Sequence, residues 1–180
     1  VVPIEADSGA IGGKDSQEFI MPSDIGEDTF LTCPGCGYAA NAEKGVFTRP
    51  SAPSEELLPV EDIHTPGQKT IQDLVDNLHV TAAQTLKTVF YISDGEMTFV
   101  TLRGYLDVQE VKLKRALGSN ELRLATDEEL AAAGIVAGSA SAVGITGLKS
   151  IADESIHVVT NFGPWANELD YPLRNVHPPP

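Results

Sequence analysis

The stretch KTVFYISDGEMTFVTLR, residues 87–103, decides the fold that we expect for this chain. Two runs rich in β-branched and aromatic residues lie on either side of Asp94 and Gly95. Such runs favour extended strands, and an Asp-Gly pair readily adopts the positive φ angles of a tight turn. The stretch therefore predicts a β-hairpin.

The segments on both sides of the hairpin alternate in type. Before it, IQDLVDNLHV (residues 71–80) has apolar residues at helical spacing, which predicts a helix with Thr70 as its N-cap. After it, DVQEVKLKRALG (107–118) predicts a short helix ended by Gly118, and Thr126 is expected to cap DEELAAAG. The short apolar pieces of residues 141–162 are expected to be strands that close the sheet. Together these elements predict an α/β fold with a mixed, mostly antiparallel sheet surrounded by short helices.

The N-terminal part is less regular. GAIGG, residues 9–13, lacks the Lys and Ser/Thr of a phosphate loop, so it predicts a bend between two strands. Residues 48–68 are rich in proline and have no periodic apolar pattern. They are predicted to be a linker between residues 1–47, a small strand-rich piece, and the domain of residues 69–180.

Composition narrows the classes of function. The 180 residues include 26 acidic and 12 basic side chains, a formal net charge of −14. This balance argues against sequence-independent binding to a nucleic-acid backbone, so any tRNA or DNA contact is expected to be local. No run reaches the 18 apolar residues of a membrane helix, and we expect a cytoplasmic protein that contacts no membrane. Because the chain begins with Val1 and ends in three prolines, we expect a piece of a longer protein.

Basic and small residues offer three candidate features. Lys87 begins the first hairpin strand, where its ammonium either holds a phosphate as a point charge or is simply solvated. The small residues 138–142 form either an ordinary turn or a loop whose backbone N–H groups stabilise an oxyanion. A basic cluster either touches a nucleic-acid backbone or forms a solvated helix face; its members are Arg103, Lys112, Lys114 and Arg115.

Cys33 and Cys36 form a CxxC motif with three interpretations. It is a structural knuckle, half of a zinc site, or a redox pair that precedes a weak helix over YAANAEK (38–44). The four histidines are scattered, and the sequence contains neither a G-x-S-x-G elbow nor an HExxH motif. Classical hydrolase chemistry is therefore not supported by the residues alone.

Several motifs in a fixed order give the chain a family resemblance. They are IEADSGAIGGKDSQEF (4–19), CPGCGYAANAEK (33–44), TPGQKTIQDL (65–74), KTVFYISDGE (87–96), RG followed by EVKLKRALG (103–118), IAD (151–153), and NF with AN (161–167). In this order they resemble bacterial prolyl-tRNA synthetase over nearly the whole chain. The resemblance implies that residues 1–47 are part of a class II catalytic core with a connecting CxxC segment, and that residues 69–180 are its inserted editing domain.

The resemblance also implies an activity, which is hydrolysis of alanine wrongly attached to the proline tRNA. It implies no cofactor for this editing step, and ATP and magnesium only for the full-length ligase that joins proline to its tRNA. The implied partners are the 3′ end of the proline tRNA and the remainder of the synthetase, with a homodimer for the full-length protein. The fragment alone is not expected to aminoacylate.

The family's site residues transfer onto matching positions. The resemblance assigns catalysis to Lys87, Gly138 and Asp153. In this scheme Lys87 fixes the phosphate or ribose of the tRNA 3′ end, a ribose hydroxyl activates the water, and Asp153 shapes the pocket or recognises the amino group. The implied substrate-binding residues are Ser139, Ala140, Ser141, Ala142, Arg103, Asn161 and Pro172.

The sequence departs from the family pattern at a few positions. Ala142 stands where the loop usually has proline, and Pro172 stands where many members have a histidine that restricts the substrate to alanine. Tyr105 and Leu106 replace an acid and a histidine. These departures motivate an alternative, a module that binds the tRNA acceptor end but has lost its editing activity or shifted its specificity.

Overall fold

The computed structural model describes residues 1–9, 12–49, 56–64, 71–78, 80–136, 142, 144–158, 160–163, 165–168 and 171–177. It divides the chain into two compact units. The first comprises Val1–Thr48 with Gln109–Ala116, and the second comprises Arg49–Val108 with Leu117–Pro180. Each unit is described by itself.

The first unit contains a four-stranded sheet in the order β2-β1-β4-β3. Alternation along β1 buries Ile4 and Ala6, and Ala40 of β4 is also buried. On α2, Arg115 donates to the carbonyl oxygen of Glu43 at 2.7 Å and forms an ion pair with Asp7 at 3.1 Å. The elements are β1 (Val2–Ala6), β2 (Ser16–Ile20), β3 (Phe30–Thr32), β4 (Ala39–Asn41) and α2 (Glu110–Leu117).

Two expectations for the first unit have different outcomes. The glycine-rich bend is confirmed, because it joins the antiparallel strands β1 and β2, and its described glycines have φ of +57°, +75° and +137°. The weak helix expected over residues 38–44 is wrong. Residues 39–41 form strand β4, which pairs with both β3 and β1, so their backbone groups bond between strands instead of within a helix.

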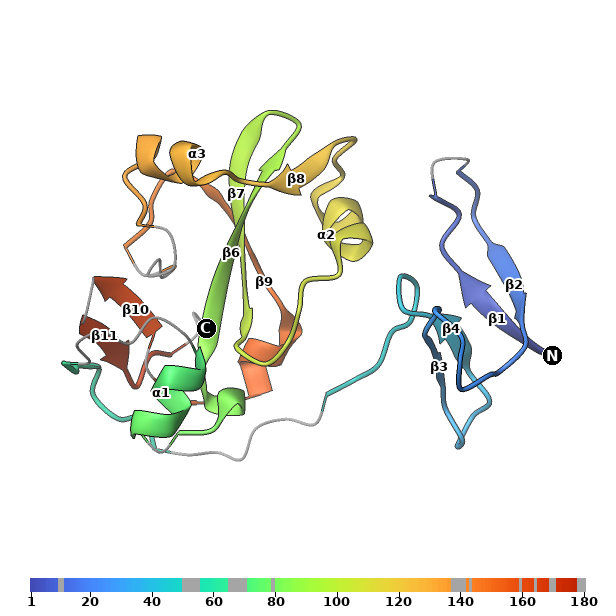
Figure 1. Cartoon of the computed structure of the whole chain (residues 1–180), viewed down its shortest axis with the longest axis horizontal. Coiled ribbons are helices and arrows are strands. Elements are labelled where there is room, and N and C mark those ends of the chain that lie inside the picture. The colour runs from blue at the N-terminus through green and yellow to red at the C-terminus, as the bar shows by residue number, and fades with distance from the viewer. Residues whose placement is uncertain are drawn as a thin grey trace. The chain divides into compact units, whose positions relative to one another are not determined.

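The second unit is built on the predicted hairpin, which is confirmed. β6 (Leu86–Ser93) pairs antiparallel with β7 (Glu96–Arg103), and Asp94 and Gly95 at the turn have φ of +48° and +87°. β8 (Leu122–Leu124) adds antiparallel to β6, and β9 (Lys149–Ala152) adds parallel to β7. In Figure 1 this hairpin is the long green pair, flanked by β8 and β9. The mixed, mostly antiparallel α/β fold is thus confirmed.

The predicted helices are present in the described residues. α1 spans Ile71–Leu78, while its expected N-cap, Thr70, lies outside the described residues. α2 is followed by Gly118, whose φ of +68° suits the residue after a helix. α3 (Asp127–Ala132) begins at Thr126, which accepts a hydrogen bond from the Glu129 amide as expected of an N-cap.

The expectation of strands throughout residues 141–162 is only partly right. Residues 149–152 form β9, but Glu154–Val158 form a 3₁₀-helix, η3. The physical reason is local, because the carboxylate of Asp153 accepts a hydrogen bond from the Ser155 amide and turns the chain out of the strand. Further along, Phe162 makes only an isolated bridge, with Val176.

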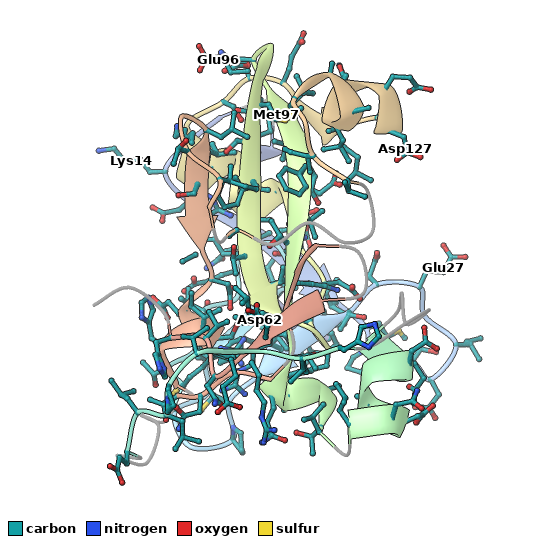
Figure 2. The ribbon with its side chains drawn as sticks, turned by 90° about the vertical axis from the view of Figure 1, so that its left-hand side faces the viewer. Lys14, Glu27, Asp62, Glu96, Met97 and Asp127 are labelled. Carbon is teal, nitrogen blue, oxygen red and sulfur yellow. The ribbon has the colours of Figure 1, made fainter. Side chains whose placement is uncertain are left out.

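A second, three-stranded sheet has the order β10-β11-β5. Its strands are β10 (Trp165–Glu168), β11 (Tyr171–Arg174) and β5 (Glu61–Asp62). The segment expected to be a linker therefore contributes a strand to the second unit. Figure 2 labels Asp62 of β5 well away from Glu96, which lies at the turn of the β6–β7 hairpin.

Two apolar clusters fill the second unit. The end cluster consists of Leu86, Ile156, Phe162 and Val176, and the hairpin cluster consists of Phe90, Phe99 and Leu130. Ala142 packs against both clusters. Since Leu86 and Phe90 are four residues apart on β6, both clusters lie on the same face of that strand.

Candidate functional site

Lys87 makes a defined contact at the start of β6. Its Nζ lies 2.9 Å from a carboxylate oxygen of Asp107. The Lys87 side chain is 26% exposed, so its stem is mostly covered, whereas the Asp107 side chain is 97% exposed. The ammonium is thus held at the surface by a carboxylate that itself lies almost wholly in solvent.

The turn that carries Asp107 is anchored to the strand of Lys87. The Gly104 amide donates to the carbonyl oxygen of Thr85 at 2.9 Å, and the Leu106 amide donates to that of Arg103 at 3.0 Å. Arg103, a predicted substrate-binding residue, donates from Nε to the carbonyl oxygen of Ser155 at 2.8 Å. Its guanidinium therefore ties the end of β7 to η3.

Asp153 lies at the same end of the sheet as Lys87. Its amide donates to the carbonyl oxygen of Thr101 at 2.9 Å, and its carboxylate accepts from the Ser155 amide at 2.8 Å. Lys87 pairs with Leu102, the next residue along β7. Because neighbouring strands are about 4.8 Å apart, the backbones of Lys87 and Asp153 are on the order of 10 Å apart.

Asn161 has a structural role in the second unit. Its Oδ1 accepts from the Leu58 amide and its Nδ2 donates to the carbonyl oxygen of Glu56, both at 2.9 Å. Its φ of +54° is one that Asn tolerates better than most residues. The side-chain amide thus holds the segment that leads into β5, and contact with substrate stays a prediction.

The remaining predicted residues are partly outside the described residues. Gly138, Ser139, Ala140 and Ser141 all lie outside them. Pro172 lies on β11, where it pairs with Ala166, and its neighbour Leu173 packs against the end cluster.

Most described candidates thus gather at one end of the sheet, next to members of the end cluster. Lys87 follows Leu86, Asn161 precedes Phe162, and Ala142 packs against the cluster directly. Side chains alternate along a strand, so Lys87 leaves β6 on the face opposite Leu86 and hence opposite Ala142. Among the described strands, β8 pairs only with residues 91–93 of β6, which leaves Lys87 on an open strand edge around which its long stem can reach.

Two residues of this region were missed by sequence reasoning. Asp107 was not singled out, because its contact with Lys87 spans 20 positions along the chain and no local pattern indicates it. Thr88 was also missed, and its buried Oγ1 has no hydrogen-bond partner among the described residues. Alternation puts Thr88 on the face of Leu86 and Phe90, between the two apolar clusters. No pattern in the sequence marks that hydroxyl.

The cysteine pair lies in the first unit as a tight turn with free thiols. The Gly37 amide donates to the carbonyl oxygen of Cys33, and the Cys33 amide donates to that of Tyr38. Hydrogen bonds from the backbone and thiol of Cys36, then from the Gly35 backbone, lower the pKa of the Cys33 thiol from its ordinary value. Within the part of the chain that the structure describes, no three His, Cys, Asp or Glu side chains are grouped to hold a metal ion.

Among the described helices, none has both the length and the apolar character that crossing a membrane requires.

Comparison with known proteins identifies relatives of the whole chain. It is 49% identical over 174 residues to a proline–tRNA ligase of Dehalococcoides mccartyi (strain CBDB1), and 41% identical over 179 residues to one of Syntrophomonas wolfei. Each alignment covers 97% of this chain and 31% of the relative. The chain thus spans about a third of the length of these ligases.

A solved structure shares the fold. It is described as a putative trans-editing enzyme for prolyl tRNA synthetase, and it matches with a TM-score of 0.58 at 19% identity over 64% of this chain and 74% of its own. Residues 65–177 match the family model of the aminoacyl-tRNA editing domain. Because this match covers more than half of the chain, the chain belongs to the aminoacyl-tRNA editing domain family.

Proposed function

We propose that this chain hydrolyses the ester of alanine wrongly attached to the proline tRNA. Water adds to the ester carbonyl, the bond between the carbonyl carbon and the ribose oxygen breaks, and that oxygen takes up a proton. The products are free alanine and uncharged tRNA. The family and the similarity to proline–tRNA ligases support the proposal.

The observation that carries it is the position of Lys87. Its ammonium is paired with the exposed carboxylate of Asp107, and Lys87 lies at the end of the sheet where Asp153 and members of the end cluster also lie. A lysine ammonium is a point charge that suits a phosphate oxygen. In this proposal Lys87 holds the phosphate or ribose of the tRNA 3′ end while a ribose hydroxyl activates the water.

The need for such a reaction follows from the energetics of recognition. A synthetic site for proline tolerates the smaller alanine, because a missing methylene or two costs only about 1–3 kcal/mol of discrimination. A second pocket that admits alanine and rejects proline supplies the rest. We assign this pocket to the end of the sheet near the end cluster, with Asp153 shaping it and residues 138–142 providing backbone donors to the carbonyl oxygen.

The test is deacylation of alanyl-tRNA of the proline type, with prolyl-tRNA as the substrate that is spared. Lys87→Ala is expected to reduce the rate by at least about a hundredfold, because the loss removes a group that binds the reacting end. Lys149→Ala is the matched control, since Lys149 lies on β9 opposite Thr98, toward the other end of the sheet. Full activity of Lys87→Ala would contradict the proposed site.

The alternative function, a module that only binds the acceptor end, predicts a different result. Affinity for tRNA would then persist while no small aminoacyl ester was hydrolysed by the chain or by the whole protein that contains it. We further propose that the whole protein is a homodimeric, cytoplasmic ligase that uses ATP and magnesium to join proline to its tRNA, and that editing itself needs no cofactor.

A further inference from the structure

We infer that Asp107 is a positioning residue for Lys87: its carboxylate holds the ammonium in one orientation while a phosphate of the tRNA end binds to another of the three N–H donors of that ammonium. This inference rests on the proposed function, because it deepens the role of Lys87. Its starting point is the 2.9 Å contact between Lys87 Nζ and the Asp107 carboxylate.

Stability does not explain this contact. Ion pairs at the surface contribute little to the free energy of unfolding, because water screens the charges and both side chains lose freedom. Asp107 is 97% exposed, so it buries almost none of its own surface. Removing the Asp107 carboxylate should therefore change the stability of the fold little. Its main effect should be on the position of the Lys87 ammonium.

The position of Asp107 is set by its turn. The Gly104 amide bonds to Thr85, two residues before Lys87, and the Leu106 amide bonds to Arg103. Arg103 in turn bonds to Ser155 of η3 through its Nε. The carboxylate is thus carried by a backbone that is tied to the same end of the sheet as the lysine, and this tie reduces the freedom that the pair must lose.

An ammonium shared by a carboxylate and a phosphate has measurable consequences. A carboxylate next to the ammonium competes with the incoming phosphate, so it weakens binding of the tRNA end. The same carboxylate keeps the ammonium in one orientation, which favours the geometry needed for reaction. Removing it should therefore tighten binding and slow the chemical step, which is a split between KM and kcat that a general loss of fold does not produce.

The experiment uses the full 180-residue chain and alanyl-tRNA of the proline type. Asp107→Asn is expected to lower KM about threefold and kcat about tenfold, and Asp107→Glu is expected to restore kcat in large part. Glu96→Gln is the matched control, because Glu96 is an exposed acid at the turn, the far end of the same hairpin (Figure 2). Its KM and kcat should equal those of the unchanged chain.

A second measurement separates this inference from the proposed function. In the chain labelled with ¹³C-lysine, the ε-methylene resonance of Lys87 should shift in Asp107→Asn and not in Glu96→Gln. A shift without a fall in kcat, where Lys87→Ala is inactive, would overturn the positioning role and leave the proposed function intact. The absence of a shift would show that the pair does not form and would also overturn it. Full activity of Lys87→Ala would overturn the proposed function itself.

Discussion

At the scale of single residues, we expect substitution by valine to change the free energy of unfolding in opposite directions at two threonines of the hairpin. Thr88 Oγ1 is buried without a partner among the described residues, whereas Thr98 Oγ1 donates to the carbonyl oxygen of Lys149 at 2.8 Å. A buried polar group without a partner costs about 1–3 kcal/mol, and valine has nearly the shape of threonine. Thr88→Val should therefore raise the free energy of unfolding by about 1 kcal/mol.

Thr98→Val is the matched control for that prediction. It removes a buried hydrogen bond on the neighbouring strand, so it should lower the free energy of unfolding by about 1 kcal/mol. Denaturant unfolding of the two variants measures both changes. A loss of stability in Thr88→Val equal to that in Thr98→Val would mean that the Thr88 hydroxyl has a partner.

The residue scale also shows what sequence can predict about the site. Lys87 was indicated by its place at the start of the first hairpin strand, and the family resemblance indicated both Lys87 and Asp153. The fold brings both residues to one end of the sheet. The contact with Asp107 spans 20 positions along the chain, so it depends on how the turn after β7 folds back, which no local pattern shows. The hydrogen bonds that Arg103 donates to the carbonyl oxygen of Ser155 and Asn161 donates to that of Glu56 could not be predicted for the same reason.

At the scale of elements, the contribution of helix α3 to the stability of the fold depends on pH through Glu129. Glu129 bonds to Arg123 at 2.7 Å and to the Thr126 amide at 2.9 Å, and these bonds, the one to Arg123 first, lower the pKa of Glu129 from 4.5 to about 2. A carboxyl group with a lower pKa in the folded state stabilises the fold above its unfolded pKa. That contribution is lost as the pH falls from about 4.5 to about 2.

Glu129→Gln tests this dependence. The variant should have a lower Tm than the unchanged chain at pH 6 to 7, and the difference should shrink on acidification until little of it is left near pH 2, where about half of Glu129 is protonated in the folded state. Thermal unfolding followed by circular dichroism across this range measures it, with Glu96→Gln as the control. A difference in Tm that persisted unchanged to pH 2 would show that the charge of Glu129 is not its cause.

A second element-scale prediction concerns the segment that leads into β5. Asn161 bonds to Glu56 and Leu58, while Asn175 donates to the carbonyl oxygen of Pro59 at 2.8 Å. Asn161→Gly removes both side-chain hydrogen bonds of Asn161, while glycine still tolerates the φ of +54° at this position. Together the two hydrogen bonds are expected to contribute about 1–2 kcal/mol to local stability. Hydrogen exchange at the Leu58 amide should therefore become about tenfold faster. Asn175→Gly is the control, because it removes the bond to Pro59 and leaves the Leu58 amide paired; equal acceleration in both variants would contradict the assignment.

Elements with strong local signals were predicted, and those that depend on distant partners were not. Asp94-Gly95 and the Thr126 cap act within a few residues, so the hairpin and α3 could be read from the chain. β5 has only two residues, Glu61 and Asp62, and no strand pattern. It exists because β11, more than 100 positions later, offers an edge to pair with, and a proline-rich stretch gives no sign of that.

At the scale of the whole molecule, net charge limits the contacts with tRNA that the proposed function requires. Residues 1–68 carry twelve acidic and three basic groups, and residues 69–180 carry fourteen and nine. A net charge of −14 repels a phosphate backbone, so contacts with tRNA must be few and local. The chain spans 31% of the ligases that it resembles, and we expect the rest of such a protein to deliver the tRNA.

The dependence of tRNA affinity on salt concentration measures how many phosphates the chain contacts. Each phosphate neutralised on a single strand contributes a slope of about −0.7 in a plot of log affinity against log salt concentration, because counterions are released. With Lys87 as a contact, Lys87→Ala should make the slope for binding of uncharged proline tRNA shallower by about that amount. Lys149→Ala should leave the slope unchanged, and fluorescence anisotropy at 50 to 300 mM salt measures all three proteins. An unchanged slope in Lys87→Ala would mean that the ammonium contacts no phosphate. Of the two groups proposed for Lys87, only the ribose of the tRNA end would then remain.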